Sequence, residues 1–189
     1  MKYLEDIILK EGRILDNDII KVDSFLNHQI KPEVINKFAK DVVEHFLNVK
    51  VDKVLTIETS GIAVAYAVAV EFGNIPLVFA KKSKSKTVVD DVYNAEIKSF
   101  TRGVSSNVTI SKRFLSEGEN IIIVDDFLAE GNAAYGLIEM CKEAKANVVG
   151  YATVIEKGFQ GGRKKLEALG IDTFSGAIIK DFKNGKPVF

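Results

Sequence analysis

Two adjacent aspartates, Asp125 and Asp126, follow an aliphatic run in the segment IIIVDDFLAEGNA, which spans residues 121–133. In an open parallel sheet, ligands bind where the carboxyl ends of the strands meet the N-termini of helices. Ionised carboxylates accept hydrogen bonds and donate none, so such a pair suits the hydroxyl groups of a sugar. An isolated aspartate pair is more often one helix cap and one solvated side chain, and the residues that follow must decide between these interpretations.

A run of mostly small residues comes next and leads into a predicted helix; it comprises Ala129, Glu130, Gly131, Asn132 and Ala133. The first backbone N–H groups of a helix have no partner within it and can surround a phosphate. Each charge-assisted hydrogen bond there contributes roughly 1.5–3 kcal/mol. The chain contains neither GxxxxGK[ST] nor GxGxxG, so a nucleoside triphosphate or dinucleotide site is not indicated. The pattern predicts a site for a phosphosugar of another kind.

Alternating strands and helices must position these residues. Apolar runs predict buried strands at 54–58, 75–80, 121–124, 147–156 and 174–179. Helical spacing predicts helices at 33–47, 62–70, 134–141 and 163–170. Nearly continuous apolar strands that alternate with helices predict an α/β fold with a parallel sheet covered on both faces. Residues 92–100 and 107–111 interrupt this alternation, and their period of two predicts an antiparallel hairpin.

Composition narrows the class of partner. The 189 residues favour one domain, and 26 basic against 26 acidic side chains give zero formal charge, which argues against nucleic acid or an acidic membrane as partner. The single cysteine, Cys141, permits no intramolecular disulfide and fits a reducing, cytoplasmic setting. The amphipathic N-terminus matches neither a secretory signal nor a membrane span. His28 and His45 lack ligand spacing, and neither is assigned a catalytic role.

The segment IIIVDDFLAEGNA resembles the signature with which the phosphoribosyltransferase family binds phosphoribosyl pyrophosphate. The resemblance implies the type I fold, a twisted and mostly parallel sheet flanked by helices, in a single domain of residues 1–189. It also implies a small hood formed largely by residues 1–32 and a flexible hairpin flap at 83–113. By the same resemblance, Asp125 and Asp126 hold the ribose hydroxyls, and Ala129 to Ala133 bind the 5-phosphate.

One position departs from the family pattern. Many members carry Thr-Gly-Gly where this chain has Glu130-Gly131-Asn132, so a hydroxyl contact to the phosphate is lost. We therefore expect Glu130 to face solvent and the backbone N–H groups to do more of the binding.

The resemblance also assigns a pyrophosphate site. In the segment ETSGIA (58–63), Thr59, Ser60 and Gly61 correspond to a loop that binds pyrophosphate through backbone N–H groups. Lys81 and Lys82 could neutralise the pyrophosphate charge, across a dimer interface in the manner of relatives. Taken alone, the loop would be a plain turn, and the run KKSKSK, with Lys84 and Lys86, would be a solvated loop.

The whole chain is most similar to the bacterial xanthine phosphoribosyltransferases, through IKVDSFLNHQI (20–30) and VIEKGFQ (154–160). This similarity implies that Ile20 and Asn27 lie against a purine and that Lys157 reaches its oxygen edge. The implied reaction joins N9 of xanthine to the phosphoribosyl group and releases pyrophosphate. Mg²⁺ would be held mainly by the substrate's oxygens with no direct protein ligand, and the chain would be a homodimer.

Two alternatives stay open at this point. A hypoxanthine or guanine enzyme of the same fold differs only in the base that it accepts. A regulator that senses phosphoribosyl pyrophosphate and binds nucleic acid would need a basic face, which zero net charge does not indicate.

Overall fold

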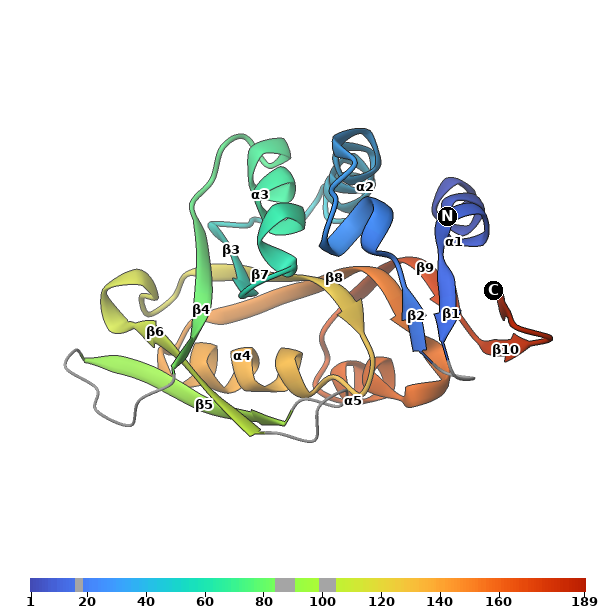
Figure 1. Ribbon diagram of the computed structural model, residues 1–189. Coiled ribbons are helices and arrows are strands. Elements are labelled where there is room, and N and C mark those ends of the chain that lie inside the picture. Colours follow the sequence, from blue (N-terminus) through green and yellow to red (C-terminus); the bar gives the residue numbers. More distant parts are fainter. Residues whose placement is uncertain (16–18, 84–90, 99–104) are drawn as a thin grey trace.

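A central sheet organises the chain, and the computed structural model describes residues 1–15, 19–83, 91–98 and 105–189 (Figure 1). In this described part, the sheet has seven strands in the order β5-β6-β4-β3-β7-β8-β9. The parallel strands are β3 (Lys53–Ile57), β4 (Leu77–Ser83), β7 (Asn120–Leu128), β8 (Asn147–Lys157) and β9 (Thr173–Ile179). The chain places β4 on one side of β3 and β7 on the other, so the strand order reverses between β3 and β7. Ligands bind at such a switch point in open α/β sheets.

Helices cover both faces of the sheet (Figure 1). On one side lie α1 (Lys2–Glu11), α2 (Pro32–His45) and α3 (Gly61–Glu71), and on the other lie α4 (Asn132–Glu143) and α5 (Gly162–Ala168). Side chains of β7 alternate between two hydrophobic cores, with Ile122 and Val124 in the first and Ile121 and Ile123 in the second. Each fully buried side chain of this size stabilises the fold by about 1.5–3 kcal/mol.

The antiparallel hairpin formed by β5 (Val92–Lys98) and β6 (Ser105–Ser111) extends the sheet beyond the end of β4. It confirms the hairpin predicted from the period of two. Residues 84–90 and 99–104 of the expected flap, with Lys84 and Lys86, lie outside the described residues, so flap motion stays a prediction.

Smaller elements precede and follow the sheet. They are β1 (Arg13–Leu15), β2 (Ile19–Lys21), the π-helical turn η1 (Asp23–Asn27), the 3-10 turns η2 (Lys112–Phe114) and η3 (Gly158–Gln160), β10 (Asp181–Lys183) and β11 (Lys186–Val188). An ion pair between Glu11 and Lys31 (2.6 Å) ties the end of α1 to the start of α2. The expected hood of residues 1–32 comprises α1, β1, β2 and η1, and its formation as a hood stays a prediction. Within the described residues, no helix has the length and apolar character needed to cross a bilayer.

The one boundary that matters for the site is the end of β7. The sequence predicts a strand that stops at Val124, whereas β7 continues to Leu128, because Asp125, Phe127 and Leu128 stay paired with β8. The acidic pair therefore belongs to the strand itself. Strand pairing fixes the direction of both carboxylates more firmly than a loop would.

Candidate active site

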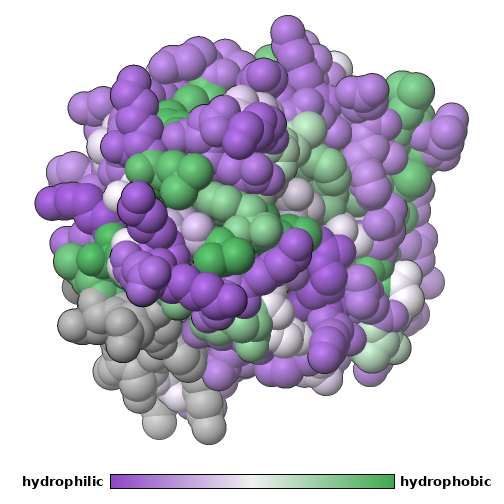
Figure 2. Space-filling model, turned by 90° about the vertical axis from the view of Figure 1, so that its right-hand side faces the viewer, coloured by the Kyte–Doolittle hydropathy of each residue, from purple (hydrophilic) through white to green (hydrophobic). Residues whose placement is uncertain are grey.

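The loops that follow β3 and β7 meet the turn η1 around one cavity of about 910 Å³. A volume of this size falls in the range of small-molecule sites. The polar part of its lining comes mainly from Asn27, from residues 58–60 and from residues 125–133. Figure 2 shows the side of the molecule toward which β7 points in Figure 1; it is mostly hydrophilic, with hydrophobic patches near its middle. The predicted phosphate and pyrophosphate loops therefore share one cavity.

The acidic pair lies in the wall of this cavity, and each aspartate is only 7% exposed. The backbone N–H of Asp126 donates a hydrogen bond to Oδ1 of Asp125 (2.9 Å). Burial raises the pKa of Asp125 well above its usual range, and the neighbouring charge of Asp126 raises it further, whereas Lys82 acts in the opposite direction. A ligand whose hydroxyl groups donate to the pair would favour its charged form and offset the effect of burial.

The predicted phosphate loop leads directly into α4. Gly131 adopts a left-handed conformation (φ 80°), which glycine accepts without a steric penalty, and the helix starts at Asn132. All five residues of the loop, 129–133, line the cavity. The first N–H groups of a helix have no acceptor within it, so this arrangement can bind an anion.

Glu130 does not face solvent in the way the sequence predicts. It is half-buried, and its Oε2 accepts a hydrogen bond from Nδ2 of Asn132 (3.3 Å). The carboxylate is drawn to the first residue of α4 because a polar side chain and a helix N-terminus both favour an anion there. The expectation of a solvated Glu130 is therefore wrong in part.

The predicted pyrophosphate loop follows β3. Glu58, Thr59 and Ser60 line the cavity, and the peptide bond between the first two is cis. Gly61 lies behind them: a Cβ at this position would be 2.4 Å from Oγ1 of Thr56 and 2.9 Å from Oδ1 of Asp125. Only glycine lets the start of α3 approach the acidic pair this closely. Gly61 thus brings the two loops together without lining the cavity itself.

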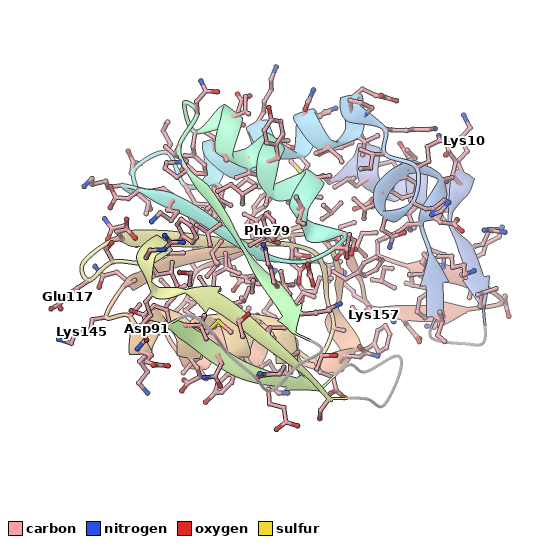
Figure 3. All side chains as sticks on the ribbon, turned by 60° about the vertical axis from the view of Figure 1, so that its left-hand side comes forward. Lys10, Phe79, Asp91, Glu117, Lys145 and Lys157 are labelled. Atoms are coloured by element: carbon pink, nitrogen blue, oxygen red, sulfur yellow. The ribbon has the colours of Figure 1, made fainter. Side chains whose placement is uncertain are left out.

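The two lysines predicted at the pyrophosphate site, Lys81 and Lys82, differ in their position relative to the cavity. Lys82 lines the cavity, and its backbone N–H donates to Oε1 of Glu58 (2.5 Å). Lys81 is outside the cavity lining and has its ammonium 5.9 Å from the centre of the Phe79 ring, which Figure 3 labels on β4. Successive side chains of a strand point to opposite faces, and on β4 this alternation directs Lys82 to the cavity and Lys81 to the side of Phe79.

The three predicted base-binding residues also differ in position. Asn27 lines the cavity, whereas Ile20 and Lys157 are outside its lining and are each 7% exposed. Ile20 belongs to the hydrophobic core that also contains buried residues of α1 and α2. Lys157 ends β8, where it pairs with Ile179 of β9, and Figure 3 labels it near the carboxyl ends of the strands.

The sequence does not indicate an ion-pair network that adjoins Lys157. Glu156 is 2% exposed and accepts hydrogen bonds from Nη2 of Arg163 (2.7 Å) and from the hydroxyl of Ser175 (2.6 Å). Arg163 also donates to the backbone oxygen of Thr173 (2.8 Å). The network joins β8, α5 and β9 and so holds the end of the strand that carries Lys157.

Tyr151 is a second residue that the sequence does not indicate. It is 1% exposed yet lines the cavity, one strand away from Asp125. Burial, followed by the charges of Asp125 and Asp126, keeps the pKa of its hydroxyl well above the usual range, so the hydroxyl stays a donor. A tyrosine within a buried strand carries no sequence signal that distinguishes it from core.

Comparison with known proteins is consistent with this geometry. The family model "Phosphoribosyl transferase domain" matches residues 21–184. Xanthine phosphoribosyltransferases of Clostridioides difficile (strain 630) and Leuconostoc mesenteroides are 49% and 46% identical to this chain over 189 residues, which is 100% of each chain.

Solved structures agree on the fold. An adenine phosphoribosyltransferase from Rhodothermus marinus has a TM-score of 0.75 at 20% identity, with 95% of this chain and 100% of that chain covered. One from Trypanosoma brucei, in complex with AMP, pyrophosphate and ribose-5-phosphate, has a TM-score of 0.76 at 16% identity, with 93% and 79% covered. At these identities the likeness concerns the fold alone.

Proposed function

This chain belongs to the phosphoribosyltransferase family, and we propose that it acts in purine salvage as a xanthine phosphoribosyltransferase. It has the type I fold that the family resemblance implies. The enzyme transfers the 5-phosphoribosyl group of phosphoribosyl pyrophosphate to N9 of xanthine, and the products are xanthosine 5′-monophosphate and pyrophosphate. The observation that carries the chemistry is the single cavity in which the acidic pair, the 129–133 loop and the 58–60 loop meet.

Each part of the cavity has a role in binding phosphoribosyl pyrophosphate. Asp125 and Asp126 accept hydrogen bonds from the ribose hydroxyls, and the N–H groups of residues 129–133 bind the 5-phosphate. Thr59 and Ser60, which line the cavity, offer backbone N–H groups to the pyrophosphate together with Gly61 behind them, and Lys82 adds a positive charge from the next strand. Fixing the sugar between two anion sites exposes its C1 carbon to the base and needs no covalent nucleophile.

Stabilisation of the departing pyrophosphate is the main catalytic requirement, because negative charge leaves while positive charge develops on the ribose. Within the described residues, no group of three or more His, Cys, Asp or Glu side chains could hold a metal ion. The donor set of the cavity suits a hard cation that is held mostly by the substrate's own oxygens, with Asp125 and Asp126 nearby. Mg²⁺ bound in this way would supply charge neutralisation at the pyrophosphate.

The base is assigned to xanthine through the similarity to the two relatives and through three side chains. Xanthine presents two exocyclic oxygens, for which the amide of Asn27 and the ammonium of Lys157 are suitable donors. Asn27 lines the cavity, and the network of Glu156 and Arg163 holds the strand end at which Lys157 lies. Ile20 would then pack against the purine from the hood.

A panel of four bases tests the activity. Purified protein is incubated with phosphoribosyl pyrophosphate, Mg²⁺ and xanthine, guanine, hypoxanthine or adenine, and pyrophosphate release is measured. We expect the highest kcat/KM with xanthine. Far better use of hypoxanthine or guanine would favour the related enzymes of this fold, and release with none of the bases would favour a regulatory role, which a gel-shift assay with nucleic acid would then examine.

A homodimer is the proposed assembly, and a second copy would cover an apolar groove of about 580 Å³ over α2 and α3. Ile30 and Tyr66 line this groove and are 44% and 64% exposed, and Phe79 on the next strand is 36% exposed. Lys81 lies beside Phe79 and outside its own cavity, so in a dimer it could serve the partner's pyrophosphate site. Light scattering after size exclusion should give twice the chain mass, and Tyr66→Glu should give monomers. A location in the cytoplasm stays a prediction of the sequence.

A further inference from the structure

Negative charge predominates in the cavity. Among the described residues that line it, Glu58, Asp125, Asp126 and Glu130 are acids, whereas Lys82 is the one base. A phosphorylated sugar is itself anionic, so each of these carboxylates opposes its binding unless a proton or a cation offsets the charge. Glu130 is the acid of most concern, because it is part of the loop that would hold the 5-phosphate.

Two hydrogen bonds hold Glu130, one at its carboxylate and one at its backbone oxygen. Its carboxylate Oε2 accepts from Nδ2 of Asn132 (3.3 Å), and its backbone oxygen accepts from Nζ of Lys165 (2.9 Å). Lys165 is exposed and belongs to α5, 35 residues further along the chain. An ammonium group is thereby placed on the same residue that carries the unwanted carboxylate.

Backbone contacts keep α5 at this position. The N–H of Gly162 donates to the backbone oxygen of Ala129 (3.1 Å). A Cβ on Gly162 would lie 2.4 Å from that oxygen and 3.0 Å from the nitrogen of Gly131, so only glycine allows the approach. Lys165 lies one helical turn after Gly162, and its ammonium therefore stays at the loop.

We propose that Lys165 is a positioning residue that offsets the charge of Glu130 and fixes its carbonyl, so that the phosphate loop accepts a phosphate although it contains an acid. This inference rests on the proposed function, because it takes residues 129–133 as the 5-phosphate site. It gives a reason for the unusual sequence of the loop: an acid there is tolerated when a lysine from α5 compensates for it.

Ribose 5-phosphate is the probe that tests the inference, since it carries the phosphate and the ribose hydroxyls but no pyrophosphate. Its Kd is measured by titration calorimetry on the full chain. Lys165→Met should raise this Kd by about two- to fivefold, because the exposed ammonium that contacts the Glu130 carbonyl contributes to binding only as a solvent-screened charge near the loop. Glu130→Gln should lower it or leave it unchanged, and the double variant should return to within about twofold of the wild type.

Controls separate charge from structure. Lys164→Met removes a neighbouring exposed lysine of the same helix and should leave the Kd unchanged. Lys165→Arg keeps the charge and should retain binding. In turnover assays, Lys165→Met should raise the KM for phosphoribosyl pyrophosphate while kcat and the KM for xanthine stay the same, because Lys165 touches no reacting atom.

The outcomes are distinct. Unchanged binding in Lys165→Met, or an equal loss with and without Glu130→Gln, would overturn charge compensation. A weaker affinity of Lys165→Met for ribose 5-phosphate that Glu130→Gln restores would support charge compensation. The wild type and the variants could show the expected order of Kd values for ribose 5-phosphate while the wild type releases no pyrophosphate with any base. In that case the proposed activity fails and the inference about Lys165 stands.

Discussion

Replacing Asp125 with asparagine should make the ligand-free protein more stable at neutral pH. Asp125 is 7% exposed and directly precedes a second buried aspartate, Asp126. Its Oδ1 accepts the N–H of Asp126 at 2.9 Å, and asparagine can keep that acceptor. The substitution therefore removes a charge from a buried site while the local hydrogen bond and the side-chain shape are preserved.

The sign of the pH dependence follows from the direction of the pKa shift. Burial, followed by the charge of Asp126, holds the pKa of Asp125 in the folded chain well above the ordinary value of 3.8. The folded state thus binds this proton more tightly than the unfolded state. That contribution to stability is fully present below the unfolded pKa and is lost as pH rises through the folded pKa. Wild type and Asp125→Asn should therefore melt at similar temperatures near pH 4 and diverge toward pH 8.

The expected gain at pH 8 is modest but measurable. Single substitutions that relieve an unfavourable native group commonly add about 0.5–2 kcal/mol. For a chain of this length, each kcal/mol moves the Tm by about 2–4 °C, so the rise should be roughly 1–8 °C. Scanning calorimetry without ligand, from pH 4 to pH 8, measures it. Asp6→Asn, at an exposed aspartate of α1 that pairs with Lys2 at 3.2 Å, is the control and should change the Tm at pH 8 by less than Asp125→Asn does.

Two results would refute this reasoning. One is an Asp125→Asn protein that is less stable than the wild type at pH 8, and the other is a Tm difference that does not change with pH. The same variant should gain its stability at the expense of function: its KM for phosphoribosyl pyrophosphate should rise by about tenfold or more, since a charge-assisted hydrogen bond contributes roughly 1.5–3 kcal/mol.

Gly162→Ala should raise the KM for phosphoribosyl pyrophosphate by about tenfold or more in steady-state assays, because its Cβ would lie 2.4 Å from a backbone oxygen of the phosphate loop. Gly161→Ala, whose Cβ meets nothing within 4 Å, should lower only the Tm, through its positive φ. Arg163→Gln should lower the Tm by several degrees and raise the KM for xanthine, because the buried Glu156 loses its 2.7 Å partner; Arg163 is 27% exposed, so the cost falls below the roughly 3–5 kcal/mol of a fully buried pair. An unchanged KM would show that the pair is purely structural. Lys82→Met should weaken pyrophosphate binding in calorimetry by about tenfold with little change in Tm, and equal affinity would contradict its role in the cavity.

The sequence predicts the elements of the sheet well, because hydrophobic periodicity is a local property. The alternation of apolar runs with helical patterns identifies β3, α3, β7 and α4 within a few residues. The family resemblance then identifies the loops at the ends of β3 and β7, and the structure brings both to one cavity. Strand ends in a parallel sheet lie along one edge, so the order of strands and helices along the chain is enough to place these loops together.

The positions of individual site residues depend on the face of the strand or helix from which each side chain projects. Lys81 and Lys82 are the same residue type, yet only Lys82 lines the cavity, because successive side chains of β4 leave opposite faces of the strand. The end of β7 likewise depends on pairing with β8, which keeps Asp125 within the strand.

The sequence by itself determined the alternating elements, the acidic pair and the small loop after it, since each is encoded by neighbouring residues. Only the tertiary structure decided that Gly162 and Lys165 support that loop, because packing brings together residues more than 30 positions apart. The same holds for Glu130, whose environment depends on α5 and on the start of α4. Contacts between distant segments follow from the shape of the packed chain, and no local pattern records them.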